Sequence, residues 1–125
     1  EVDIFASSHT CLPAMRRFDY QGEKLVANNG AAGMPNFAGT GFGILTRIGL
    51  HASPHEPLYG DVVRDVHVDA LAVRYATNAW REMFLANWPP GSPAWLSYFR
   101  RICDGPDYTP PQAFAGGNAL TASPA

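Results

Sequence analysis

The sequence has few cysteines, no large excess of either charge and no long apolar runs. Two cysteines in 125 residues are too few for a disulfide framework, which favours a reducing compartment and a cytoplasmic location. Nine basic against eleven acidic residues give a net charge of −2, so we expect no nucleic-acid surface, which needs a basic patch. No run approaches the roughly 18 consecutive apolar residues of a membrane-spanning helix. We therefore expect no membrane association.

The residues that are present have a globular composition. Hydrophobic residues make up 46% of the chain and charged residues 16%, which is enough for one domain with an apolar core. The chain starts at Glu1 and is inside an apolar strand by Ile4, whereas a domain usually begins with a looser surface segment. We therefore expect this chain to be the later part of a longer protein.

Apolar patterning predicts strands in the first part of the chain and helices in the second. The strands are expected at residues 2–6, 14–18, 24–27, 44–50, 62–63 and 66–75, with a bulge near Ala70 where the apolar face changes. Residues 14–27 read as a hairpin in which Gly22 supplies positive φ. Residues 52–60 read as a surface loop, and His51 at its start and His55 within it as solvated side chains.

Two helices are predicted over residues 77–88 and 93–104. Thr77 or Asn78 is expected to cap the first helix, and Ser92 the second. The aromatic stripes of both helices are typical of packing surfaces. Residues 106–125 are rich in Pro, Gly and Ala and are expected to be loose. The predicted class is α/β, with strands over residues 1–75 and the helices appended.

Polar residues gather directly after the first strand, in the stretch Ser7–Cys11. In an extended segment residues two apart point to the same side, so His9 and Cys11 face one cavity. Imidazole and thiolate are good ligands for zinc or iron. Two ligands do not make a site, and Cys11 as a nucleophile activated by His9, or as a buried structural residue, are alternatives.

Two further features carry weaker functional hypotheses. Residues 28–43 hold five glycines in sixteen positions, which predicts a long loop of the kind that is often functional. His67 and Asp69 project from the same face of a predicted strand. They are either an oriented ligand pair or part of a polar face in contact with solvent.

The segments "SSHTCLP" and "LVANNGAAGMPN" resemble the last two motifs of the calcineurin-like metallophosphoesterases. In that family a strand ends in a Gly-His-Thr-His-like turn, and an Asn-Pro-Gly-Ser-like turn follows one hairpin later. The likeness covers roughly residues 1–50. The matching positions are Ser8, His9, Thr10 and Cys11 for the first turn, residues 28–31 for the second, and Pro13 and Pro35 for the prolines that follow each turn.

This resemblance implies a fold, an activity and a site. The fold would be part of a metallophosphoesterase-type β-sandwich with a mixed sheet, over residues 1–105. The activity of the intact protein would be phosphoester hydrolysis with two divalent metal ions, zinc, iron or manganese. His9 and Cys11 would be metal ligands. The loop beside the substrate would be formed by Asn28, Asn29, Gly30 and Gly33.

The family's earlier motifs, Asp-x-His, Gly-Asp and Gly-Asn-His, do not occur here as a set. Gly60-Asp61 is a lone dipeptide in the wrong order along the chain. The resemblance thus implies that the other ligands belong to an N-terminal portion outside this chain, which alone would be inactive. The expected partners are a phosphoester substrate and either that missing portion or a second copy. The alternatives are a non-catalytic interaction module and a degenerate phosphoesterase that binds without hydrolysis.

Overall fold

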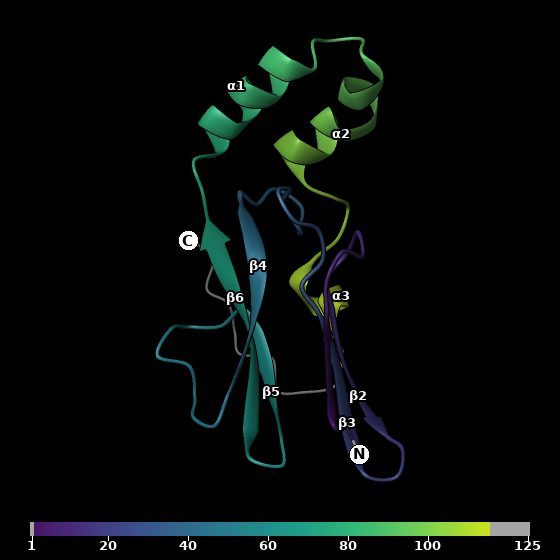
Figure 1. Ribbon diagram of the computed structural model, residues 1–125, viewed down its shortest axis with the longest axis vertical. Helices are drawn as coiled ribbons and strands as arrows, with labels where there is room; N and C mark the ends of the chain where they lie inside the picture. Colours follow the sequence, from purple (N-terminus) through teal and green to yellow (C-terminus); the bar gives the residue numbers. More distant parts are fainter. Residues whose placement is uncertain (1, 116–125) are drawn as a thin grey trace.

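The computed structural model describes residues 2–115, which form a two-layer sandwich with a helical hairpin at one end (Figure 1). Two β-sheets pack face to face, and the pair of helices lies beyond one end of both. The expected α/β class is confirmed: in the described residues six strands lie in the first 75 residues, the two long helices follow, and a two-residue strand comes last at 114–115.

The first sheet has the strand order β1-β3-β2-β7 and is mixed. Strand β1 runs parallel to β3, β2 runs antiparallel to β3, and β7 runs parallel to β2. The predicted hairpin is confirmed: β2 and β3 pair from Asp19↔Glu23 onward, and Gly22 in the turn has φ 101°. The bounds are β1 Ile4–Ser7, β2 Ala14–Asp19, β3 Glu23–Asn28 and β7 Phe114–Ala115.

The second sheet is antiparallel, with the order β4-β6-β5 and the bounds β4 Phe42–Gly49, β5 Tyr59–Val63 and β6 Val66–Arg74. Arg64 and Asp65 both have positive φ, as a two-residue type I′ turn requires. The expected bulge near Ala70 is wrong, because the register of β6 against β4 runs without a break from Phe42↔Arg74 to Gly49↔His67. The apolar face changes at this point because residues 68–71 are buried on both faces of β6, not because the strand kinks.

The core lies between the sheets. Alternate residues of each strand point into it, and Leu25 and Val68 have no exposed surface. The loop of residues 28–43, which we call the glycine-rich loop, also contributes. Its Phe37 is buried at the helix end of the sandwich and stacks on Tyr108 with ring centroids 6.0 Å apart. The loop is therefore anchored by its middle. The buried core residues are Met15, Leu25, Ala27, Phe37, Ile44, Tyr59, Val63, Val68, Ala70 and Ala113.

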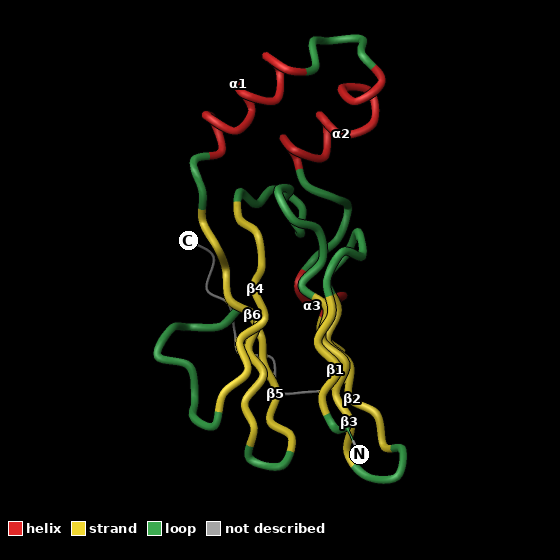
Figure 2. Tube along the Cα trace, viewed as in Figure 1, coloured by secondary structure: helices red, strands yellow, loops and turns green. Residues whose placement is uncertain are grey.

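The helical hairpin consists of α1 (Thr77–Asn87) and α2 (Pro93–Asp104), drawn in red in Figure 2. Ser92 caps α2 as predicted, and its Oγ accepts a hydrogen bond from the Trp95 amide at 3.3 Å. The cap predicted at Thr77 or Asn78 is wrong, because α1 already begins at Thr77 and the N-cap residue is Ala76, which makes no side-chain cap. Aromatic rings, with Phe84 at their centre, pack the helices together. None of the helices in the part of the chain described here is long and apolar enough to cross a membrane.

Residues 106–115 differ from the expectation of a loose segment. They form the short helix α3 (Pro110–Ala113) and strand β7, and Ala113 is fully buried. The hydroxyl of Tyr108 donates to the carbonyl of Pro13 at 2.9 Å. The aromatic rings of Tyr108 and Phe114 account for the difference, since both pack against the core. Residues 116–125, the rest of the predicted loose segment, lie outside the described residues.

Candidate functional site

The turn of residues 8–11, which we call the His9 turn, lies beside the glycine-rich loop at the helix end of the sandwich. Because β1 and β3 are parallel neighbours, their carboxyl ends fall at the same edge of the sheet. The Asn29 amide donates to the Ser7 carbonyl at 3.3 Å, and the His9 amide donates to the Gly30 carbonyl at 3.2 Å. The two segments that carry the family resemblance are thus in direct backbone contact.

Asn28 ties the two segments with its side chain. It is only 8% exposed. Its Nδ2 donates to the Ser7 hydroxyl at 2.9 Å, and its Oδ1 accepts from the Thr10 hydroxyl at 2.7 Å and from the Gly30 amide at 2.8 Å. One amide side chain therefore fixes the strand end, the turn and the loop. The role predicted for Asn28 beside a substrate stays a prediction.

Two glycines shape the loop where it passes the turn. Gly30 and Gly33 have φ 76° and 74°, a region that other residues seldom adopt. A Cβ at Gly30 would lie 2.9 Å from the Pro13 nitrogen and would clash with the amide oxygen of Asn36. That oxygen accepts from the Ala31 amide at 2.8 Å and belongs to a fully buried side chain. Only glycine permits this close approach.

His9 and Cys11 are both exposed on the turn. The alternative of a buried structural Cys11 is therefore wrong. His9 has φ 72°, so the backbone is not extended there, and the argument that His9 and Cys11 face one side because they are two residues apart is also wrong. The carbonyl of Cys11 accepts a hydrogen bond from the Arg101 guanidinium of α2, which attaches the turn to the helical hairpin.

The donor set here fits part of a metal site and not a whole one. A protein zinc site uses at least three protein ligands, whereas no group of three or more His, Cys, Asp or Glu able to hold a metal occurs in the described part of the chain. His9 and Cys11 offer two accessible donors at most. We therefore derive no catalytic step through a metal from these residues alone.

The remaining histidines lie in other parts of the chain, and His67 is a partly buried residue of β6. His51 and His55 are exposed, as predicted. Asp69 is not on a solvent face as expected: it is 6% exposed, and its carboxylate pairs with the Arg47 guanidinium at 2.9 Å. Arg47 lies directly opposite Asp69 in the β4–β6 register. Arg47 was visible in the sequence, but its pairing with Asp69 can be predicted only once the register of β4 and β6 is known.

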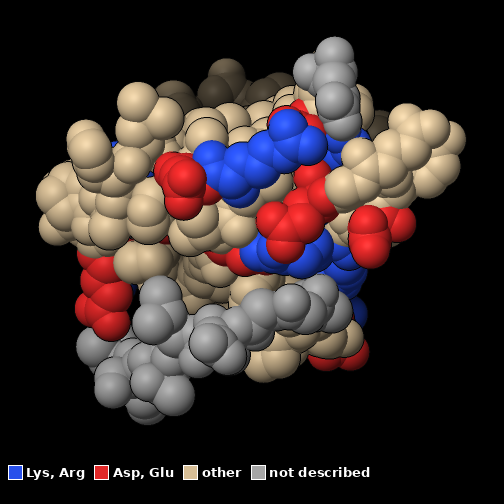
Figure 3. All heavy atoms as spheres, turned by 90° about the horizontal axis from the view of Figure 1, so that it is seen from below, with Lys and Arg blue, Asp and Glu red and all other residues tan. Residues whose placement is uncertain are grey.

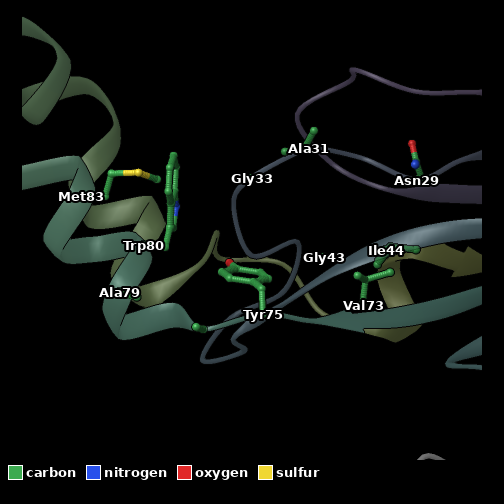
Figure 4. Close-up of a pocket in the computed structure, with 12 residues that line it drawn as sticks. Asn29, Ala31, Gly33, Gly43, Ile44, Val73, Tyr75, Ala79, Trp80 and Met83 are labelled. Carbon is green, nitrogen blue, oxygen red and sulfur yellow. The ribbon is translucent and has the colours of Figure 1, made fainter. Parts of the chain in front are cut away.

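A cavity of about 570 Å³ lies on the other side of the glycine-rich loop, beneath α1 (Figure 4). We call it the helix pocket. Sequence reasoning missed it because its walls come from three separate segments. Burial raises the pKa of the Tyr75 hydroxyl on its wall. The lining residues are Asn29, Ala31, Ala32, Gly33, Gly43, Ile44, Val73, Tyr75, Ala76, Ala79, Trp80 and Met83.

Comparisons of the chain with models of protein families, with curated proteins and with solved structures found no significant match. The metallophosphoesterase resemblance therefore depends on the two motifs and their placement.

Proposed function

We propose that this chain is one part of a metallophosphoesterase that hydrolyses phosphoesters with two divalent metal ions, zinc, iron or manganese. The observation that supports it is the contact between the exposed His9 turn and the glycine-rich loop at the carboxyl ends of two parallel strands. Ligands of open α/β sheets bind beyond the carboxyl ends of the strands. A turn fixed there by the buried Asn28 presents its side chains to solvent at the position where such a site is expected.

Each residue of this end has a proposed role. The His9 imidazole is a metal ligand, and the Cys11 thiolate takes the place of a second one. Asn28 holds the turn, and Gly30 and Gly33 let the loop backbone pass close to it. Metal ions bound there activate water and polarise phosphoryl oxygens. The other ligands come from a portion outside this chain, so the 125-residue chain alone is inactive.

Substitution of Cys11 separates the ligand role from the nucleophile role. In the protein at its natural length, hydrolysis of 4-nitrophenyl phosphate is followed with saturating manganese. A ligand role predicts that Cys11→His keeps or raises the rate and that Cys11→Ser lowers it. A nucleophile role predicts that both substitutions abolish turnover. If neither changes the rate, Cys11 has neither role.

A non-catalytic interaction module is the second candidate, because the first sheet exposes apolar side chains on its outer face, beside Arg16 and Lys24. Phe5 is 51% exposed and stands beside Val26, which is 36% exposed, and Phe18 lies on the same face. Within the residues described, β1 is also an unpaired sheet edge, and such edges invite pairing with another chain. This surface fits either the missing portion proposed above or a second copy.

Sedimentation of the 125-residue chain tests that surface. We expect self-association at concentrations near 100 μM, and loss of it in Phe5→Lys, because a charge on the apolar face must be desolvated on pairing. Leu96→Lys, at an exposed apolar position of α2, is the matched control and should associate as the wild type does. A monomer at all concentrations would contradict the expectation.

A further inference from the structure

The helix pocket has the size and shape of a small-molecule site. Its volume of about 570 Å³ is within the range of roughly 300–1,000 Å³ that is usual for ligand pockets. Ile44 and Val73 form one wall at the ends of β4 and β6, and Trp80 and Met83 of α1 form the opposite wall. Figure 4 shows these side chains on either side of the gap, with Tyr75 between them.

The lining selects for an uncharged group. No charged side chain is among the residues that form the wall, and a phosphate without a cation beside it would lose its hydration at large cost. Trp80 and Tyr75 instead offer ring surfaces for stacking. Met83 is half-exposed, and its flexible thioether packs well against an aromatic ring. An aromatic hydrocarbon ring would pack well against all three side chains.

The pocket shares a wall with the candidate phosphoryl site. Asn29 lines the pocket, while its two chain neighbours hold the His9 turn: Asn28 through its side chain and Gly30 through its carbonyl. The same loop thus faces the apolar cavity on one side and the exposed turn on the other.

We propose that the helix pocket binds an uncharged aromatic group, and that this group is the part of the phosphoester substrate that leaves with the bridging oxygen. The second half of the statement rests on the proposed phosphoesterase function, and the first half does not. The proposal makes the pocket a specificity site: it favours esters of aromatic alcohols over esters of small aliphatic ones.

Binding of 2-naphthylmethanol to the 125-residue chain tests the first half by calorimetry. Ala79 lines the pocket from an exposed position of α1, so Ala79→Phe fills the cavity with little effect on the core. Ala86→Phe makes the same change at an exposed position of α1 outside the pocket. We expect the alcohol to bind the wild type, Ala79→Phe to weaken binding about 10-fold or more because the ring loses its buried surface, and Ala86→Phe to change it less than about 2-fold.

Circular dichroism of each variant shows whether α1 is intact. If either variant unfolds, Ala79→Leu and Ala86→Leu replace the pair with a smaller side chain. Absence of binding to the wild type at millimolar alcohol, or equal binding to both variants, would overturn the inference.

Hydrolysis by the protein at its natural length tests the second half. The substrates are 2-naphthylmethyl phosphate and methyl phosphate, which both release a primary alcohol, so that recognition and not leaving-group acidity decides between them. We expect kcat/KM to be about 10-fold or more higher for the naphthyl ester, and Ala79→Phe to remove this preference. Equal rates for both esters would overturn the specificity role and leave the phosphoesterase proposal standing. No hydrolysis of either ester, with the alcohol still bound, would overturn the phosphoesterase proposal and leave the pocket standing.

Discussion

The two ends of the sandwich are closed by opposite chemistry. At the end away from the helices, charged side chains of both sheets gather on one face (Figure 3). Arg17 reaches from the first sheet to pair with Asp61 of the second and with Glu23 at 2.6 Å. Lys24 pairs with Asp3 at 2.7 Å. At the helix end, in the part of the chain that the structure describes, no ion pair joins the His9 turn to the glycine-rich loop: the Asn28 amide holds them together, the Arg101 guanidinium donates to the Cys11 carbonyl, and the loop borders an apolar cavity.

This difference separates a structural end from a candidate functional one. At the charged end each pair holds one segment to another. The hydrogen bond that Arg17 donates to the Asp61 carboxylate raises the pKa of the Arg17 guanidinium. At the helix end the buried side-chain amide of Asn28 fixes the His9 turn, in which His9 and Cys11 are exposed. An ordered turn that exposes possible ligand side chains beside a cavity is typical of a binding site.

The largest effect should come from filling the contact between turn and loop. Gly30→Ala places a Cβ against Pro13 and Asn36 at positive φ, so we expect the free energy of unfolding to fall by about 3 kcal/mol or more. Urea titration followed by circular dichroism measures it. Gly39→Ala is the control: φ is also positive but nothing lies within 4 Å, so about 1 kcal/mol is expected. Equal losses in both variants would mean that the close approach does not exist.

Removal of the amide clamp should cost somewhat less. Asn28→Ala leaves the Gly30 amide without its acceptor and removes the hydrogen bonds to Ser7 and Thr10, although the Thr10 hydroxyl still reaches the Leu12 carbonyl at 2.8 Å. We expect a loss of about 2 kcal/mol. Hydrogen exchange at the Gly30 amide should accelerate more than exchange in β4. Asn87→Ala, which removes one exposed hydrogen bond to Met83, should change stability by less than about 0.5 kcal/mol. Unchanged exchange at Gly30 would show that the turn and loop are held by other contacts.

The ion pairs at the opposite end should matter less. Arg17 is about one-third exposed, so water screens its interactions, and we expect Arg17→Met to cost about 1 kcal/mol. A double-mutant cycle with Asp61→Asn isolates the pair, and its coupling energy should be about 1 kcal/mol. A coupling near zero would mean that the charged end is held by the hairpins and not by its charges.

The smallest expected effect is a decrease in stability at low pH. The hydrogen bond from Lys24, aided by the charge of Arg64, lowers the pKa of Asp3 below its usual 3.8. A lowered pKa in the folded state stabilises the fold above the unfolded value and is lost as the pH falls through the folded value. Stability should thus decline below about pH 4, and by less in Asp3→Asn. Identical pH profiles for the two proteins would contradict this assignment.

Local signals in the sequence predicted the local elements. The hairpin of β2 and β3 follows from alternation and Gly22, and the start of α2 from Ser92 before a proline. What failed depends on contacts between distant residues. Ala76 begins α1 without a side-chain cap, and Tyr108 anchors a segment whose average composition is that of a loose one. The average composition of a segment does not show that its aromatic rings pack against the core.

The candidate site was predictable in part for the same reason. The order of motifs placed the His9 turn and the glycine-rich loop near each other, and the parallel pairing of β1 and β3 brings them into contact. The helix pocket required knowledge of where α1 lies over the sheet ends, which no spacing in the sequence encodes. The positive φ at His9 could not be predicted either, because residues other than glycine seldom adopt it.

The most direct test of the account is the metal content of the protein purified at its natural length, measured by elemental analysis of wild type, His9→Ala and His55→Ala. The account predicts about two equivalents of zinc, iron or manganese per chain in the wild type. It predicts the same content in His55→Ala, since that histidine is exposed in a distant loop, and a clear loss in His9→Ala. Wild-type protein without bound metal, or His9→Ala with its full complement, would contradict it.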